Sequence, residues 1–199
     1  MARKEKYNPK DFLKPDVMLN LYAQGAFPMV EDDNEINWYM PQIRTVILPE
    51  EFNIPRSLKK FISTSSFEFK YDFDSLKVIR NCADREKTWI SEELISAYRN
   101  LIDLGFLHSV ETYQDGKLVG GLYGIAFRGA FFGESMFSGV SQASKCALVK
   151  LVERLRERNF VILDVQYQTE HLKMFGAKEI SFADFSQLLQ KAYKNNVKF

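Results

Sequence analysis

A run of three strand patterns separated by two tight-turn signals constrains the fold of this chain more than any other feature. The strands are predicted over Leu107–Tyr113, Lys117–Ala126 and Ala130–Phe137. Asp115-Gly116 and Arg128-Gly129 stand between them, where hairpin turns belong. Because consecutive strands joined by tight turns pair in the antiparallel sense, the middle of the chain is predicted to be an antiparallel meander.

The segments after this meander predict how the sheet is covered. Apolar residues recur at helical spacing, opposite a charged face, at Leu148, Leu151, Val152 and Leu155. The continuous apolar run Phe160–Leu163 is typical of a strand covered on both sides, and a last helix is predicted over Phe182–Tyr193. Meander, helix, buried strand and helix, in this order, indicate an α/β (α+β) fold of the acyltransferase type.

The first forty residues differ in texture from the rest of the chain. Prolines break them into short pieces, with a helix predicted only over Pro15–Gln24 and stopped by Gly25. Regular elements begin after Arg44: strands over Thr45–Leu48 and Phe67–Tyr71, and helices over Ser57–Ile62, Asp74–Ala83 and Ser91–Leu104. Ser91 can cap the last of these helices and Gly105 can stop it.

Composition indicates a globular protein of the cytoplasm. No apolar run approaches the length of a membrane span, and the start, Met1 to Lys6, lacks the apolar core of a signal peptide. The two cysteines lie far apart without metal-ligand spacing, so we expect reduced thiols and no metal site.

The net charge of +1 excludes a global positive field for nucleic acid, so RNA would need a local patch. The helix with Arg56, Lys59 and Lys60 is one candidate, and the run from Arg154 to Arg158 is another. Either could equally be a solvated helix face.

Polar residues at three positions interrupt apolar strands. Glu134, which follows Gly133, either faces the surface by alternation or points into a pocket. Asp164 and Gln166 follow the buried run, and their spacing of two places them on one strand face. They either form a ligand site at the strand end or cap neighbouring loops. His171 is interpreted as a residue whose side chain is satisfied by the backbone.

Aromatic residues in irregular segments are candidates for stacking on exposed bases at an RNA end, although they could also fill a core. They lie in Leu21–Pro28, in Ile36–Pro41 and in Asp84–Ile90.

Taken together, these segments resemble the leucyl/phenylalanyl-tRNA–protein transferase family. The resemblance runs in order from Asp16 to the C-terminus. The matching strings are Tyr22…Gly25-Ala-Phe-Pro28, Trp38…Pro41 with Arg44, Ile54…Arg56-Ser-Leu-Lys59, Cys82-Ala-Asp-Arg-Glu…Thr88-Trp-Ile90, Val119-Gly-Gly-Leu-Tyr-Gly124, Gly133-Glu-Ser-Met-Phe-Ser138, Ala143-Ser-Lys145, Asp164…Gln166 and His171…Gly176-Ala177.

The resemblance implies a small N-terminal domain, residues 1–43, on a domain of the N-acetyltransferase-like (GNAT) fold, residues 44–199. It implies transfer of Leu or Phe, and weakly Met, from charged tRNA to proteins that begin with Arg or Lys, which marks them for N-degron proteolysis. The family favours a monomer. Aminoacyl-tRNA and not acetyl-CoA is the expected donor, because Gly139–Ser144 has too few glycines for a pyrophosphate loop. No cofactor is expected.

The resemblance also implies roles for single residues. Gln166 would touch the acceptor amine while Asp164 polarises it or receives its proton. Tyr22 and Trp89 would hold the terminal adenosine, and Arg56, Lys59 and Lys60 would contact tRNA phosphates. The pocket for the transferred side chain would be lined by Leu122, Phe131, Met136, Leu155 and Leu163. A basic acceptor needs a counter-charge, and Glu134 is the candidate for it.

Three departures from the family pattern concern tRNA binding: a shorter N-terminal lead, Met29 where the family has Trp, and Ser63 and Thr64 in place of basic residues. Two other functions remain open. One is a non-catalytic module that binds charged tRNA or basic N-termini, and the other is a transferase with a different donor or acceptor rule.

Overall fold

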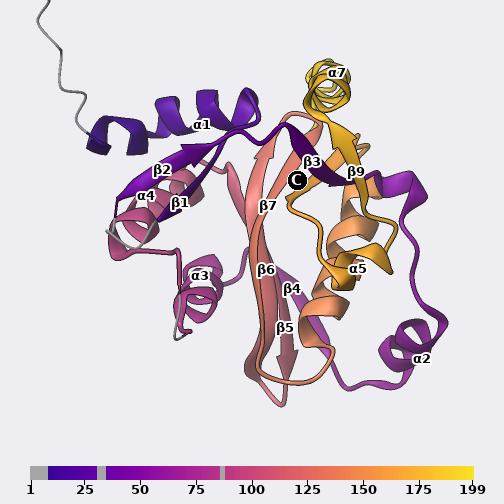
Figure 1. Ribbon diagram of the computed structural model, residues 1–199. Coiled ribbons are helices and arrows are strands. Elements are labelled where there is room, and N and C mark those ends of the chain that lie inside the picture. Colours follow the sequence, from indigo (N-terminus) through magenta and orange to yellow (C-terminus); the bar gives the residue numbers. More distant parts are fainter. Residues whose placement is uncertain (1–8, 31–34, 86–87) are drawn as a thin grey trace, which may run out of the picture.

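The computed structural model describes residues 9–30, 35–85 and 88–199, which form a mixed α/β fold around a mostly antiparallel seven-stranded sheet (Figure 1). The strand order is β4-β5-β6-β7-β8-β3-β9, and only β7 and β8 are parallel neighbours. The strands are β3 (Ile43–Ile47), β4 (Glu68–Tyr71), β5 (Leu107–Gln114), β6 (Lys117–Phe127), β7 (Ala130–Ser138), β8 (Ile162–Gln166) and β9 (Lys178–Ser181). The predicted mixed class and the antiparallel meander are confirmed, and the GNAT-like arrangement stays a prediction.

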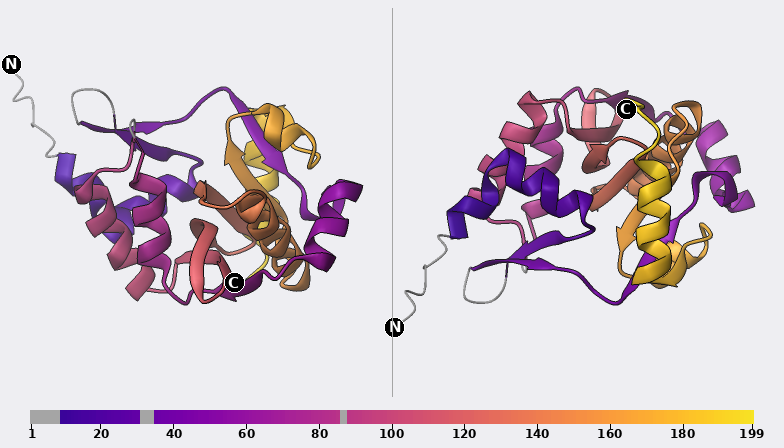
Figure 2. Two further views of the ribbon diagram at one scale, coloured as in Figure 1. Left: turned by 90° about the horizontal axis from the view of Figure 1, so that it is seen from below. Right: turned by 90° about the horizontal axis from the view of Figure 1, so that it is seen from above.

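Helices cover both faces of this sheet (Figures 1 and 2). The helices α1 (Pro15–Ala23), α3 (Ser75–Ala83) and α4 (Glu92–Asp103) lie on one side, and α5 (Ala143–Glu157) packs on the other. The remaining helices are α2 (Arg56–Thr64), α6 (Glu170–Lys173), α7 (Phe182–Ala192) and the 3₁₀ turns Pro9–Leu13 and Pro49–Glu51. Successive residues of β7 point to opposite faces of the sheet and so pack into different cores. Phe132 packs with residues of α1, α3 and α4, and Phe131 packs with residues of α5.

Turn and cap residues act as the sequence predicts. The hydroxyl of Ser91 accepts the main-chain N–H of Leu94 at 3.2 Å and begins α4, while Gly105 ends it with a left-handed φ of 73°. Asp115 and Gly116 also have positive φ, 51° and 71°, which is the backbone of a tight hairpin turn.

The N-terminal residues contain a hairpin that the sequence interpretation missed. Strands β1 (Phe27–Val30) and β2 (Ile36–Tyr39) form a separate two-stranded sheet, in which Pro28 stands opposite Trp38. Both strands are edge strands, where a proline is tolerated because one side of the backbone needs no partner. Met18 and Tyr22 of α1 share a core with residues of α3 and α4. The predicted division of the chain into two domains at residue 43 stays a prediction.

The predicted strand Phe160–Leu163 is displaced in the structure. Asn159 is left-handed with φ 59°, and the main-chain N–H of Phe160 donates to the Leu155 carbonyl at 2.9 Å. This is the hydrogen bond of a helix C-cap, so Phe160 closes α5 and β8 begins two residues later. As a consequence Asp164 and Gln166 lie within β8, not beyond it. The short edge strand β9 was also missed.

Within the described residues, no helix combines the length and the apolar character that crossing a bilayer requires. The two cysteines, Cys82 and Cys146, are buried and not joined in a disulfide. The predicted absence of a signal peptide concerns Met1 to Lys6, which lie outside the described residues.

Candidate active site

The site begins where β7 and β8 part. Their parallel pairing ends at Phe132 opposite Asp164, although both strands continue beyond this point. On its other side, β7 pairs with β6 through Gly133 and then Ser135, which leaves Glu134 without an opposite residue. This is a β-bulge, a device that re-aims a side chain next to many active sites. The local geometry therefore singles out Glu134.

Glu134 is buried, so the surface reading of this residue is wrong. Its carboxylate accepts the Tyr98 hydroxyl at 2.7 Å on one oxygen and the Gln166 side-chain amide at 3.1 Å on the other. The Tyr98 hydroxyl also lies 3.3 Å from that of Tyr22. Burial raises the pKa of Glu134 from 4.5 to about 7, although the hydrogen bonds from the tyrosines act in the opposite direction. A carboxyl group with this pKa can exchange a proton near neutral pH.

Asp164 and Gln166 lie on one face as predicted, but Asp164 is fully occupied. Arg44 of β3 donates to its two oxygens at 2.9 and 2.5 Å, and both side chains are fully buried. The main-chain N–H of Gln166 donates to the same carboxylate at 3.0 Å. The Gln166 side chain extends toward β7 and donates to the Gly133 carbonyl at 3.1 Å as well as to Glu134. Glu134 and Gln166 thus bridge the gap between the two strands.

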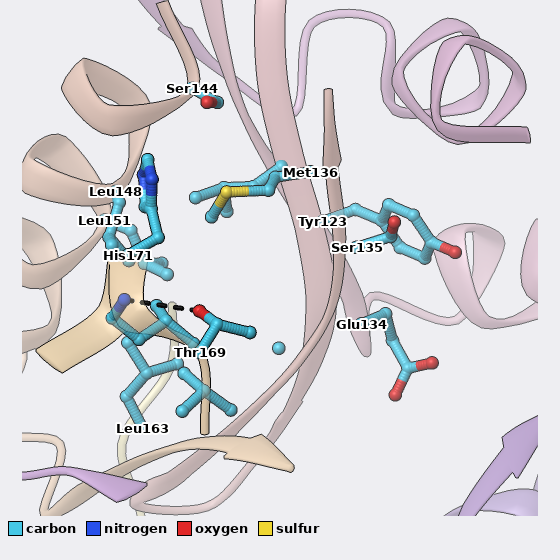
Figure 3. A pocket seen from close by; sticks show the side chains of 14 residues that line it. Tyr123, Glu134, Ser135, Met136, Ser144, Leu148, Leu151, Leu163, Thr169 and His171 are labelled. Carbon is cyan, nitrogen blue, oxygen red and sulfur yellow. Dashed lines mark hydrogen bonds between the residues drawn. The ribbon is translucent and has the colours of Figure 1, made fainter. Parts of the chain in front are cut away.

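An apolar cavity of about 280 Å³ lies beside this bridge, between β7 and α5 (Figure 3). Met136, Leu148 and Leu151 point into it from the strand and the helix, with His171 beside them. Leu122 and Leu163, which the resemblance assigns to the donor pocket, also line this cavity, and their role stays a prediction. Phe131 and Leu155 do not line it, since both are fully buried in the core beneath. Sequence reasoning missed Leu148, Leu151, Val165 and Leu172.

The two residues expected at the terminal adenosine lie in different environments. Tyr22 has no exposed surface, and its ring packs edge-on against Trp38 at a centroid distance of 5.4 Å. In this structure it offers no free ring face, because its place on the apolar side of α1 puts it in the core. Trp89 is half-buried, and its carbonyl accepts the main-chain N–H of Val30 at 3.3 Å. The adenosine contacts stay predictions.

Near the site, the sequence did not predict the contacts of Tyr98 and Arg85, and it misinterpreted His171. Tyr98 is a core residue of α4, and its contact with Glu134 depends on the bulge. Arg85 donates to the Ser135 hydroxyl at 3.0 Å and to the Met136 carbonyl at 2.9 Å, so it holds the bulged strand. His171 lines the cavity, and its buried Nε2 has no hydrogen-bond partner among the described residues. Its expected satisfaction by the backbone is therefore wrong for this nitrogen.

The two basic runs differ in exposure. Arg56, Lys59 and Lys60 are all exposed on α2, with the two lysines about one helical turn after Arg56, so they are available to an anion. Arg154 packs over the Tyr71 ring at 4.4 Å, and Arg156 donates to the Pro49 carbonyl at 2.5 Å. Arg154 and Arg156 therefore serve the fold, whereas Arg158 at the end of this run is exposed.

Comparisons with known proteins agree with the resemblance found in the sequence. Residues 46–190 match the family of the leucyl/phenylalanyl-tRNA protein transferase, and residues 12–42 match the N-terminal domain of the same protein. A leucyl/phenylalanyl-tRNA–protein transferase from Herpetosiphon aurantiacus is 46% identical over 188 residues, covering 94% of this chain and 98% of that protein. Proteins with the same name from Paramagnetospirillum magneticum (47%, covering 90% and 89%) and Salinibacter ruber (45%, covering 92% and 81%) are equally similar.

These matches define an aminoacyltransferase, an enzyme that moves an amino acid from tRNA to a protein. The chain belongs to the leucyl/phenylalanyl-tRNA–protein transferase family.

Similar solved structures are more distant. A conserved protein of unknown function from Bacteroides thetaiotaomicron has a TM-score of 0.45 at 12% identity, covering 75% of this chain and 55% of that one. The L-PGS of Bacillus licheniformis has a TM-score of 0.44 at 13% identity, covering 92% and 63%.

Proposed function

We propose that this enzyme transfers Leu or Phe, and weakly Met, from charged tRNA to the α-amino group of proteins that begin with Arg or Lys. The acceptors are thereby marked for N-degron proteolysis, and the enzyme works in the cytoplasm as a monomer. The names of relatives at 45–47% identity over most of the chain support the two donors. The acceptor rule rests on the resemblance in the sequence motifs.

The apolar cavity is the proposed pocket for the transferred side chain. Leucine, phenylalanine and methionine are all apolar, and a wall with Met136 among leucines can adapt to each. An apolar pocket distinguishes substrates that differ by one methylene by only about 1–3 kcal/mol. Some transfer of Met is therefore expected.

The proposed reaction is aminolysis of the ester that joins the amino acid to the tRNA ribose. The neutral amine of the acceptor attacks the ester carbonyl carbon, the new C–N bond forms, and the C–O bond to the ribose breaks. The amine loses one proton and the ribose oxygen gains one. Because the ester is already activated, no metal and no CoA or other cofactor is proposed.

Glu134 is the proposed acceptor of the amine proton, and Gln166 orients the amine beside it. The pKa of Glu134, about 7, suits a base that works against an amine whose ordinary pKa is near 8. Asp164 suits this role less well, because Arg44 and the Gln166 backbone occupy its oxygens. In the alternative, Glu134 instead supplies the counter-charge for the basic side chain of the acceptor.

The observation that carries the proposal is the position of Glu134 and Gln166 across the gap between β7 and β8, next to an apolar cavity. The decisive experiment mixes the purified protein with labelled Phe-tRNA, Leu-tRNA or Met-tRNA. The test proteins differ only in their first residue: Arg, Lys, Glu or Met. We expect label on the Arg and Lys proteins, most from the first two donors.

Two results would contradict the proposal. Binding of charged tRNA without any labelled product would indicate a non-catalytic module. Transfer to the Glu protein at the same rate, or from an unrelated charged tRNA, would indicate a different donor or acceptor rule.

A further inference from the structure

The Asp164 carboxylate is enclosed by the protein on every side. The guanidinium fork of Arg44 donates hydrogen bonds to both oxygens, and the main-chain N–H of Gln166 donates a further hydrogen bond to one of them. Asp164 has no exposed surface. A substrate amine therefore cannot reach this carboxylate without displacing an ion pair.

Arg44 is equally enclosed, by residues from both ends of the chain. Its guanidinium carbon lies 4.5 Å from the centre of the Phe27 ring of β1 and 4.9 Å from that of the Phe185 ring of α7. Its Nη1 has no hydrogen-bond partner among the described residues, while its other two nitrogens serve Asp164. Two aromatic rings therefore fix the plane of the fork that fixes Asp164.

Gln166 adopts a backbone conformation that needs such support. Its φ is 65°, in the left-handed region, which is unfavourable for a residue other than glycine. The hydrogen bond from its N–H to Asp164 holds this conformation, and from there its side chain reaches Gly133 and Glu134 on β7. The turned backbone thus aims the amide across the gap between the strands.

We propose that Arg44 is a positioning residue for the transfer reaction: through Asp164 it fixes the left-handed backbone of Gln166 and so holds the Gln166–Glu134 contact in place. Asp164 acts on the enzyme's own backbone and takes no proton from the acceptor. This inference rests on the proposed function, because the proposed function assigns Gln166 and Glu134 their roles in the transfer reaction.

Replacing the ion pair with neutral side chains tests the inference. Removing one partner alone would leave a buried charge unpaired and destabilise the fold, whereas replacing both with apolar residues is often neutral. The apolar pair Arg44→Met with Asp164→Leu leaves the Gln166 N–H without an acceptor. The polar pair Arg44→Gln with Asp164→Asn keeps an oxygen there. We expect kcat to fall about tenfold to a hundredfold in the apolar pair, since small misplacements cost this much. The polar pair should lose less.

Three controls separate positioning from stability. The KM for charged tRNA should stay within about twofold of the unmodified protein, because the apolar residues of the proposed donor pocket are unchanged in these variants. Ser75→Ala removes a buried hydrogen bond to Ser109 of β5, away from the site, and should lower the melting temperature without lowering kcat. Arg44→Lys keeps the charge but not the two-pronged fork, so kcat should fall about tenfold even if the paired variants do not fold.

Normal kcat in a folded apolar pair, or in Arg44→Lys, would overturn the inference, as would equal loss in the apolar and polar pairs. The unmodified protein is assayed in parallel with Phe-tRNA and an acceptor that begins with Arg. If it transfers nothing, the proposed function fails; if it transfers and the variants match it, only the role of Arg44 fails.

Discussion

The two sides of strand β7 are built on different principles. On the α5 side, Met136, Leu148 and Leu151 form an apolar wall without a fixed hydrogen-bond pattern. On the side of α1 and α4, the hydroxyls of Tyr22 and Tyr98 lead to Glu134 and on to Gln166, each with a defined partner. The apolar wall stabilises what it contacts through buried apolar area, so it tolerates substitutions of similar volume. The polar wall depends on the geometry of its hydrogen bonds, because the loss of one partner leaves a buried polar group unsatisfied.

The difference suggests a division of labour across a single strand. Under the proposed function, the apolar wall would select the donor side chain and the polar wall would act on the acceptor amine. The two walls should therefore respond differently to conservative substitutions.

The largest effect is expected from Glu134→Gln, which keeps the shape of the polar wall and removes the base. Turnover should fall about 10²-fold or more, because a positioned base contributes at least this much. The measurement is kcat/KM against pH: the unmodified protein should rise with pH through about 7, where Glu134 loses its proton, and the variant should lack this limb. Binding of a phenylalanyl-adenosine analogue should stay normal. A loss confined to acceptors with a basic first residue would assign Glu134 to the acceptor side chain instead.

The same variant checks the protonation of Glu134 in the folded state. Burial raises the pKa of this carboxyl group, so the folded protein favours the neutral form. The resulting stability is complete at acid pH, below 4.5, and is lost as pH rises through about 7. Melting temperatures from pH 5 to 8 should therefore decline more steeply in the unmodified protein than in Glu134→Gln. Parallel curves would mean that Glu134 is already ionised when buried.

Gln166→Ala removes the amide that spans the gap, and turnover should fall about tenfold to a hundredfold, since this residue orients the amine and takes no proton. Steady-state rates with saturating Phe-tRNA measure the effect. Gln114→Ala is the matched control, because Gln114 is a hydrogen-bonded glutamine at the end of β5, away from the site. Equal rates in both variants would remove Gln166 from the polar wall.

A smaller effect is expected outside both walls, at Arg56, Lys59 and Lys60 of α2. Neutralising all three should weaken binding of charged tRNA about tenfold at low salt and flatten its salt dependence by up to about three phosphate contacts. Aminoacylated adenosine alone should be used at the normal rate. Reduced use of this minimal donor would mean that α2 supports the fold of the pocket.

The smallest effect is expected from Met136→Leu in the apolar wall. A swap of similar volume costs less than about 1.5 kcal/mol, so the ratio of Phe to Leu transfer should change by less than about tenfold. Competition between the two charged tRNAs in one reaction measures this ratio. A collapse of both rates, as in Gln166→Ala, would contradict the division between the walls.

Local pattern predicted most of the fold, because its signals lie close together in the sequence. The turn at Asp115-Gly116 and the cap at Ser91 each act on neighbours within a few residues. Errors arose where an apolar run or a proline concealed the hydrogen-bond partner of the backbone. Phe160 looked like a strand residue but closes α5, and Pro28 hid a hairpin strand that forms only against β2.

The candidate site was predicted as a set of residue types and not as an arrangement. Glu134 and Gln166 stood out as polar residues in apolar strands. The bulge that aims Glu134 depends on how β6 pairs with β7, and periodicity within β7 alone does not reveal it. The pairing of Arg44 with Asp164 joins residues 120 positions apart, a distance at which spacing carries no information.

The separation of Arg44 and Asp164 in the sequence also bears on the order in which the site assembles during synthesis of the chain. Arg44 leaves the ribosome long before Asp164, and the Phe185 ring that completes its enclosure comes later still. Chains grow at about 5–20 residues per second, so the arginine waits roughly ten seconds for its covering helix. If Arg44 positions Gln166 as proposed, a partly made chain lacks this enclosure, and we expect full transfer activity only after α7 has emerged and docked.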